Sequence, residues 1–319
     1  MKVDSATIEK LKNKDKRIIS RLISKVEAND DNASEILSDI YKSGGASYKI
    51  GITGPPGAGK STLTNQLTKM LIEQGKTVGI IAVDPTSPFT GGALLGDRVR
   101  MNEIGMHPNV FIRSMATRGS LGGLSKKAID ASDVLDAAGF DYIIFETVGV
   151  GQSELDIAKT ADTTLVVLVP ESGDSIQAMK AGLMEIADFF VLNKSDRPGA
   201  DNAVMSIRTI LQLNSIRDSE WDLSIIKAIA NQNVGIDEIL NEIFKHKEYL
   251  HTSGKLLERR IRNNKIRIRN IVDNELRIEM WNETREDYLD KEAPKVAERK
   301  ISPFALADSL IENYKTTGV

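Results

Sequence analysis

The sequence predicts an α/β fold in which a mostly parallel, doubly wound sheet is accompanied by helical extensions at both ends of the chain. Short β-branched and apolar runs alternate with helical stretches between residues 48 and 229, which is the pattern of consecutive βαβ units. Several of these runs, such as residues 164–169, are apolar on both faces, as strands of a covered parallel sheet must be. The length of 319 residues suits one large domain with additions.

Helical extensions are predicted on both sides of a sheet domain that we expect to span residues 46–244. In residues 1–45 apolar side chains recur at helical spacing until Gly44-Gly45 ends the segment. Residues 245–319 show no strand pattern, which predicts a helical arm with a last helix after Pro303. The predicted apolar faces are Ile18, Ile19, Leu22, Ile23 and Val26; Ile36, Leu37, Ile40 and Tyr41; and, in the arm, Leu257, Ile261, Ile268, Ile271 and Val272.

Seven strands are predicted within the sheet domain. A helix between the first two is also indicated, because Ser61–Gln74 places its leucines on one face and stops before Gly75, a natural residue after a helix end. The predicted strands are 48–53, 77–83, 109–115, 141–146, 163–169, 188–192 and 224–229.

Composition excludes several classes of protein. Hydrophobic residues make up 41% and charged residues 27%, which excludes disordered and fibrous chains. The net charge of -3 gives no overall attraction to nucleic acid or an anionic membrane. There are no cysteines, and the three histidines are isolated, which excludes disulfide scaffolds and thiolate metal sites. Neither a membrane span nor a signal peptide is visible, so we expect a cytoplasmic protein without nucleic-acid or membrane partners.

A basic run lies in the predicted arm. Lys255–Arg269 contains seven Lys or Arg residues and one Glu. A single-strand-binding patch would interleave aromatic side chains for base stacking, and this run has none. We interpret it as a solvated helix face beside a stripe for self-association.

The segment from Gly54 to Ser61 matches the phosphate-binding loop G-x-x-x-x-G-K-S/T. It stands between a predicted strand and a predicted helix, as this motif requires. Glycines let backbone N–H groups point at phosphates, and the helix N-terminus adds its positive dipole end. We expect the Lys60 ammonium to reach the β- and γ-phosphates and the Ser61 hydroxyl to bind Mg²⁺.

Asn193-Lys194-Ser195-Asp196 follows a predicted strand, at the sheet edge where open α/β sheets bind ligands. The Asp196 carboxylate can accept hydrogen bonds from the N1–H and the exocyclic amine of guanine, whereas adenine offers no such pair. A site built around such an acceptor can reject the wrong base by roughly 10⁴-fold. Together with the phosphate loop, this motif predicts GTP or GDP as the ligand.

Acidic residues at strand ends are the candidate metal ligands. We expect Glu146 to hold Mg²⁺ through water and the N–H of Gly149 to contact the γ-phosphate. Asp84 follows the strand predicted at 77–83, and Asp97 lies in a glycine-bearing loop that can rearrange with γ-phosphate and metal. Either carboxylate could ligate Mg²⁺ or orient its waters.

These motifs closely resemble the MeaB/ArgK/MMAA family, the G-protein chaperones of adenosylcobalamin-dependent methylmalonyl-CoA mutase. The resemblance runs from about residue 10 to the C-terminus, and Glu146, where other GTPases carry the Asp of D-x-x-G, is itself a mark of this group. The segments that carry it are Gly54–Thr62, Asp84–Ser87, Gly91–Arg98, Met115–Leu124 and Glu146–Glu154.

The resemblance implies a homodimeric GTPase that uses Mg²⁺ and assists cobalamin loading and protection of that mutase or a related acyl-CoA mutase. Its arm would form the dimer, and a cobalamin adenosyltransferase is a further candidate partner. Catalytic roles fall to Lys60, Asp97, Glu146 and Gly149, and metal ligation to Ser61, Asp84, Asp97 and Glu146. The nucleotide-binding residues are Gly54, Pro55, Pro56, Gly57, Ala58, Gly59, Lys60, Ser61, Thr62, Asn193, Lys194, Asp196, Ile229, Ala230 and Asn231.

Two loops depart from the family pattern. Ala228–Asn231 stands where the base-contacting loop usually reads Ser-Ala, so we expect backbone rather than side-chain contacts there. Pro88 and Phe89 replace small or charged residues in a loop that contacts the partner.

Several alternative functions differ from that of a mutase-associated GTPase in the residues or products that they require. Nickel-insertion GTPases bind metal through Cys and His, which this sequence does not offer in suitable spacing. A partition-type ATPase would carry a second lysine where Pro55 and Pro56 stand, and a signal-recognition GTPase would need a methionine-rich domain. A protein kinase-like enzyme linked to lysine, arginine or ornithine transport would place phosphate on a protein acceptor. A pure binding module would not hydrolyse GTP.

Val150 indicates slow hydrolysis by the isolated protein. In Ras-like GTPases a glutamine at this position orients the attacking water, whereas Val150 has no hydrogen-bonding side chain and Gln152 is displaced by two residues. Candidates for an arginine finger from within the chain are Arg98, Arg113 and Arg118. We therefore expect the mutase to stimulate hydrolysis by ordering the switch loops.

Overall fold

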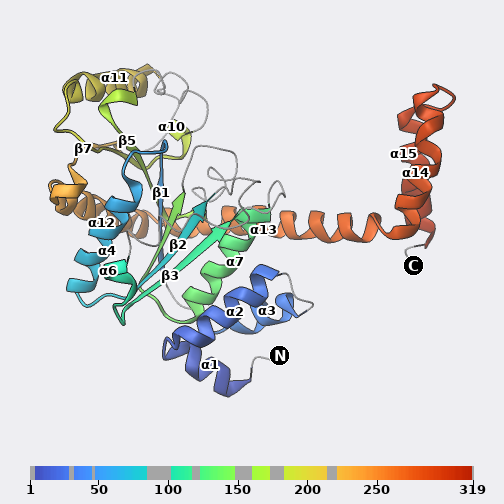
Figure 1. Cartoon of the computed structure of the whole chain (residues 1–319), viewed down its shortest axis with the longest axis horizontal. Coiled ribbons are helices and arrows are strands. Elements are labelled where there is room, and N and C mark those ends of the chain that lie inside the picture. Colours follow the sequence, from blue (N-terminus) through green and yellow to red (C-terminus); the bar gives the residue numbers. More distant parts are fainter. Residues whose placement is uncertain are drawn as a thin grey trace. The chain divides into compact units, whose positions relative to one another are not determined.

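A computed structural model of the chain contains a seven-stranded sheet in the order β3-β2-β4-β1-β5-β6-β7 (Figure 1). The structure describes residues 4–28, 32–44, 47–84, 102–116, 123–147, 160–172, 183–213 and 221–317. All the strand pairs are parallel, so the predicted fold class is confirmed. The strands are β1 Tyr48–Thr53, β2 Val78–Asp84, β3 Val110–Ala116, β4 Tyr142–Thr147, β5 Thr163–Leu168, β6 Phe189–Leu192 and β7 Ile225–Lys227.

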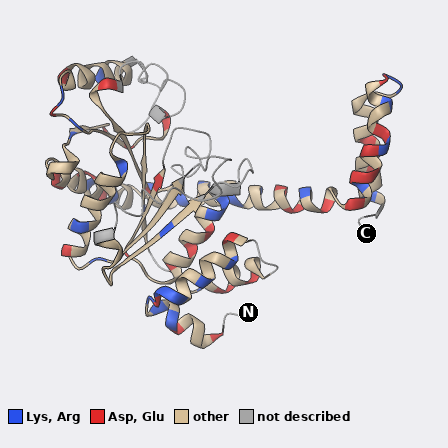
Figure 2. Ribbon diagram, in the orientation of Figure 1, with Lys and Arg blue, Asp and Glu red and all other residues tan. Residues whose placement is uncertain are grey.

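Helices cover both faces of the sheet. On one face α4 (Lys60–Glu73) and α12 (Ile236–Thr252) pack on β1, β4 and β5. On the other, α7 (Gly123–Ala137) and α11 (Ala200–Leu213) pack on either side of β1. The strands carry few charged residues, which lie mainly on the helices (Figure 2). The remaining helices are α1 Ser5–Lys12, α2 Lys16–Ala28, α3 Ala33–Tyr41, α6 Asn102–Gly105, α10 Leu183–Ile186, α13 Lys255–Met280, α14 Glu283–Ala297 and α15 Pro303–Thr317.

The N-terminal helices α2 and α3 pack on α7 through the apolar faces expected from the sequence. Leu22 on α2 and Ile40 on α3 are fully buried in one cluster with the side chains of α7. Tyr41 was expected on the buried face, and that prediction is wrong, because its side chain is 59% exposed. Each residue of a helix is rotated by about 100° from the previous one, so Tyr41 lies beyond the face that Ile36 and Ile40 bury.

A buried polar network anchors α12 to the start of the sheet. His246 Nδ1 lies 2.8 Å from the Thr163 hydroxyl, which also bonds the Tyr48 hydroxyl. His246 Nε2 lies 3.5 Å from Asp188 Oδ1, and the Trp221 ring centroid is 4.7 Å from the imidazole centroid. The sequence suggested no role for this histidine. The structure shows it joining α12 to residues at the N-terminal ends of β1, β5 and β6.

The chain divides into two compact units, residues 1–257 and 258–319. Helices α1–α3 belong to the first unit, and residue 244 lies in the middle of α12. In the second unit Arg285 is buried, donates to the carbonyls of Glu279 and Met280, and lies over the Tyr314 ring. The domain boundaries predicted at 45/46 and 244/245 stay predictions. None of the helices in the described ranges is long and apolar enough to cross a bilayer.

Truncations on α2 and α3 should distinguish a buried side chain from an exposed one. Leu22→Ala removes a fully buried side chain, and we expect it to lower the free energy of unfolding by about 2–5 kcal/mol. The control Tyr41→Ala should change it by no more than about 0.5 kcal/mol. Chemical denaturation measures both, and equal losses would contradict the packing described for α2 and α3.

Candidate functional site

The loop between β1 and α4 has a backbone that only glycine suits at several positions. Gly54, Gly57 and Gly59 have φ angles of 140°, 75° and 90°, in the region that side chains disfavour. A Cβ on Gly54 would lie 2.1 Å from the Val167 carbonyl oxygen, and one on Gly59 would lie 2.3 Å from Asn193 Nδ2. The loop is therefore closely packed against β5 and the segment after β6. Pro56 and Gly57 are exposed to solvent.

Lys60 begins α4 and folds back onto the loop. Its side chain is buried, and its ammonium donates to the carbonyl oxygens of Gly54 at 2.7 Å and Pro55 at 2.8 Å. Ser61 and Thr62 follow in the first turn of α4, where backbone N–H groups have no partners within the helix. A positive charge and a helix N-terminus thus act at the same place, which favours an anion such as a phosphate group.

The segment after β6 is joined to the phosphate loop by two side chains. Asn193 is buried and donates from Nδ2 to the Ala58 carbonyl at 2.8 Å, while its Oδ1 accepts from the Ala230 N–H at 3.0 Å. Lys194 donates to the Gly57 carbonyl at 2.8 Å. Asp196 is exposed. The loop, the N-K-x-D segment and residues 229–231, predicted separately from sequence, are therefore brought together at one edge of the sheet.

A contact between Ser61 and Glu146 joins the start of α4 to β4. The Ser61 hydroxyl donates to Glu146 Oε1, and Glu146 lies on β4 with 3% of its surface exposed. A hydroxyl and a carboxylate at one point suit Mg²⁺, which prefers oxygen ligands and needs only one or two from the protein when phosphates supply others. Among the described residues no three His, Cys, Asp or Glu side chains gather into a metal site.

Several predicted site residues lie partly or wholly outside the described residues. Asp84 ends β2, but its side chain is not among those described. Asp97, Gly149 and the candidate arginines Arg98 and Arg118 are outside the described ranges altogether.

Arg113, the remaining candidate arginine, is held by the N-terminal helices. Its guanidinium pairs with the Glu27 carboxylate and lies 3.2 Å from the Ser24 hydroxyl, both on α2. This side chain thus fastens α2 to β3.

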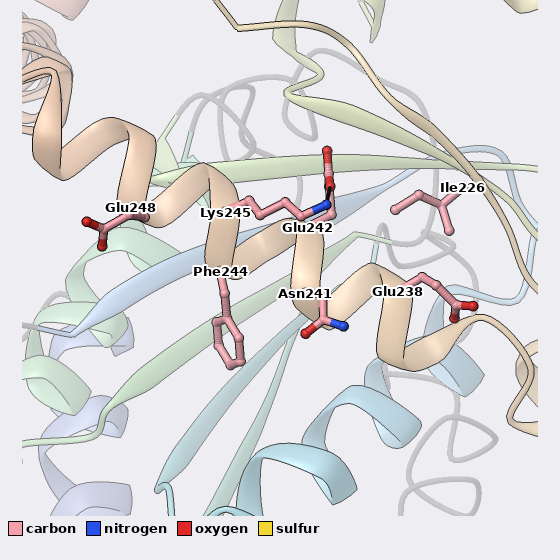
Figure 3. A pocket seen from close by; sticks show the side chains of 7 residues that line it. All are labelled: Ile226, Glu238, Asn241, Glu242, Phe244, Lys245 and Glu248. Atoms are coloured by element: carbon pink, nitrogen blue, oxygen red, sulfur yellow. Dashed lines mark hydrogen bonds and ion pairs between the residues drawn. The ribbon is translucent and has the colours of Figure 1, made fainter.

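An open pocket of about 580 Å³ lies between α12 and β7 (Figure 3). It contains none of the predicted nucleotide-binding residues. The carboxylate of Glu242 accepts from the Ser224 hydroxyl at 2.6 Å and from Lys245 at 3.3 Å, so its charge is balanced locally. The pocket is lined by Ile226, Glu238, Asn241, Glu242, Phe244, Lys245 and Glu248.

Known proteins share both the sequence and the fold. The family described as methylmalonyl Co-A mutase-associated GTPase MeaB matches residues 17–285. A Pyrococcus abyssi protein is 47% identical over 307 residues, covering 96% of this chain and 95% of its own. The mitochondrial methylmalonic aciduria type A homolog of Mus musculus is 34% identical over 277 residues, covering 84% of this chain and 66% of its own. A crystal structure of LAO/AO transport system kinase aligns with TM-score 0.74 and 28% identity over 98% of this chain and 97% of that one.

The parallel sheet, the phosphate loop and the N-K-x-D segment joined to it define a P-loop GTPase. The match over most of the sequence is more specific, and the chain belongs to the methylmalonyl-CoA mutase-associated GTPase MeaB family. It accordingly binds a guanine nucleotide and hydrolyses GTP.

Removal of the Asn193 amide should loosen the nucleotide site. In Asn193→Ala the Ala58 carbonyl and the Ala230 N–H lose their bridge, which should cost about 1–3 kcal/mol of folding free energy and weaken GDP binding on the order of tenfold. Asn241→Ala, an exposed asparagine on α12, is the matched control and should change neither. Titration with labelled GDP and thermal unfolding measure these effects, and undiminished affinity in Asn193→Ala would refute the bridging role.

Proposed function

We propose that this chain is a GTP-hydrolysing metallochaperone that assists cobalamin loading and protection of methylmalonyl-CoA mutase or a related acyl-CoA mutase. The observation that carries the proposal is the family match over residues 17–285, whose description names an association with that mutase. The mouse relative is named for methylmalonic aciduria, and this name supports a role connected with methylmalonyl-CoA. A cobalamin adenosyltransferase is a further proposed partner.

In the proposed site, the backbone and side chains of Gly54–Thr62 hold the phosphates and the Lys60 ammonium neutralises charge on their oxygens. Ser61 and Glu146, with Asp84 and Asp97, would hold Mg²⁺, which when bound offsets the charge that spreads over the γ-phosphoryl oxygens during hydrolysis. Gly149 would contribute its N–H at the γ-phosphate. The hydrogen bond between Ser61 and Glu146 supports this assignment, because it places two suitable oxygen ligands together.

The guanine base would lie between the N-K-x-D segment and residues 229–231. Asp196 would accept from the base, and backbone groups of Ile229, Ala230 and Asn231 would contact its edge. The Asn193 bridge to Ala58 and Ala230 supports this arrangement, because it ties the proposed base loop to the phosphate loop.

A homodimer formed by the arm, residues 245–319, is part of the proposal, as is a cytoplasmic location. The support is the exposed aliphatic surface of α13, which is large for a helix that faces only water. Its exposed members in the predicted stripe are Leu257, Ile261, Ile268, Ile271 and Val272.

A kinase function is favoured by one observation, the name of the aligned crystal structure of LAO/AO transport system kinase. The two functions differ in the acceptor of the γ-phosphoryl group, which is water in the chaperone proposal and a protein side chain in a kinase. Hydrolysis of γ-labelled GTP with candidate acceptor proteins present separates them, since a kinase leaves label on protein.

Asp196→Asn should exchange the preferred base. The amide can donate where the carboxylate only accepted, so GTP affinity should fall and xanthosine triphosphate, which offers an acceptor there, should bind better than GTP. A site built to hydrogen-bond a substrate group rejects an analogue without that group by roughly 10⁴-fold in related cases. Nucleotide titration of both proteins tests this, and equal affinity of the wild type for ATP and GTP would contradict the assignment.

The mutase should accelerate hydrolysis. Because Val150 offers no group to orient water, we expect slow single-turnover hydrolysis by the isolated protein and stimulation on adding methylmalonyl-CoA mutase. Completing a GTPase site can be worth roughly 10³–10⁵ in rate, and a looser chaperone contact should give less. Rapid hydrolysis by the isolated protein that no mutase changes would overturn the partner-gated mechanism.

A further inference from the structure

Two buried threonines outside the recognised motifs end the neighbouring strands β1 and β4. Thr53 directly precedes the phosphate loop, and Thr147 directly follows Glu146. The Thr147 hydroxyl donates to the Thr53 hydroxyl at 3.0 Å, and the two residues are 1% and 0% exposed. A hydrogen bond between side chains therefore joins the strand that leads into the loop to the strand that leads toward Gly149.

The surroundings of this pair are apolar. In the strand register Thr53 lies beside Val166 of β5, and Thr147 lies beside Val83 of β2. The two hydroxyls thus occupy the middle of a row of four β-branched residues that crosses four adjacent strands. Valine has nearly the same shape as threonine and would fill these positions without a polar group, so packing alone does not account for the hydroxyls. A buried hydroxyl is tolerated when it has a partner, and a hydrogen bond fixes both distance and direction.

The pair complements the contact between Ser61 and Glu146. Successive residues of a strand point to opposite faces of the sheet, so Glu146 points toward α4, whereas Thr147 points to the face that α7 covers, as Phe145 does. Glu146 bonds Ser61, which follows the phosphate loop, and Thr147 bonds Thr53, which precedes it. The end of β4 is thus tied to both ends of the loop, one from each face of the sheet.

We propose that Thr53 and Thr147 are positioning residues for GTP hydrolysis, which hold the end of β4, and with it Glu146, in register with the phosphate loop. The inference rests on the role proposed for Ser61 and Glu146. A displacement of about 1 Å at a reacting centre can cost as much as 10²-fold in rate. A hydrogen bond at the last residue of β4 limits such a displacement where the strand ends.

The test is the double variant Thr53→Val, Thr147→Val. Because both hydroxyls are removed together, neither is left without a partner, and stability should change little. We expect single-turnover GTP hydrolysis to fall roughly tenfold, while GDP affinity and the midpoint of thermal unfolding stay close to the wild type. The double variant Thr53→Ser, Thr147→Ser retains both hydroxyls and should recover most of the rate. If the double valine variant does not fold, Thr147→Val is compared with Thr147→Ser, and the thermal unfolding of both is measured as well, because Thr147→Val leaves the Thr53 hydroxyl without this partner.

Thr68→Val is the matched control. Thr68 is fully buried on α4, and its hydroxyl bonds only the Thr64 carbonyl of its own helix, at 2.7 Å, in the contacts described. This variant should hydrolyse GTP at the wild-type rate. An equal loss of rate in Thr68→Val, an undiminished rate in the double valine variant, or a parallel loss of GDP affinity would each overturn the proposal.

Glu146→Ala examines the underlying assignment separately. If this variant hydrolyses GTP at the wild-type rate, the role proposed for Glu146 is wrong, and the positioning role of the threonine pair is overturned with it. If Glu146→Ala is slow and the double valine variant is not, only the role of the threonine pair is overturned.

Discussion

The side-chain amide of Asn193 is the contact on which the proposed nucleotide site depends. The phosphate loop follows β1 and the N-K-x-D segment follows β6, but β5 lies between these strands, so no ladder of backbone hydrogen bonds joins them directly. Asn193 spans this gap by donating to the Ala58 carbonyl, and it also accepts from the Ala230 N–H in the segment after β7. Because both backbone partners are buried, the amide also satisfies groups that would otherwise be costly to bury. The three segments proposed to contact the nucleotide, which follow three different strands, are thereby held together.

Side-chain contacts hold β1 at both of its ends. At its start, the hydroxyl of Tyr48 joins the network in which Thr163 and His246 take part. At its end, Thr53 meets Thr147, and the loop that follows is packed against Val167 and Asn193. A strand fixed in this way provides a rigid support for the phosphate loop that follows it. Binding and catalytic residues are commonly found on loops supported in this way.

The N-terminal helices contact α7 and the part of the chain that leads into and forms β3. Arg113 of β3 pairs with Glu27 of α2, and the Lys16 ammonium donates to the His107 carbonyl at 2.8 Å. Together with the apolar packing on α7, these contacts attach the N-terminal helices to the half of the sheet that contains β2 and β3. Arg113, one of the three arginines that the sequence offered as candidates for a finger, therefore attaches a helix in the structure.

The strands, the phosphate loop and the N-K-x-D segment can be predicted from the amino-acid sequence alone. These features are local, because strand character depends on neighbouring apolar residues and the loop depends on glycines that tolerate positive φ. Other features became visible only in three dimensions: Asn193 bridges two loops, Thr53 meets Thr147, His246 is buried in a polar network and Tyr41 faces solvent. The bonds of Asn193 to Ala58 and of Thr147 to Thr53 join residues 135 and 94 positions apart. The donor and acceptor of each bond come together because of the order of the strands in the sheet. No local pattern in the chain specifies that order.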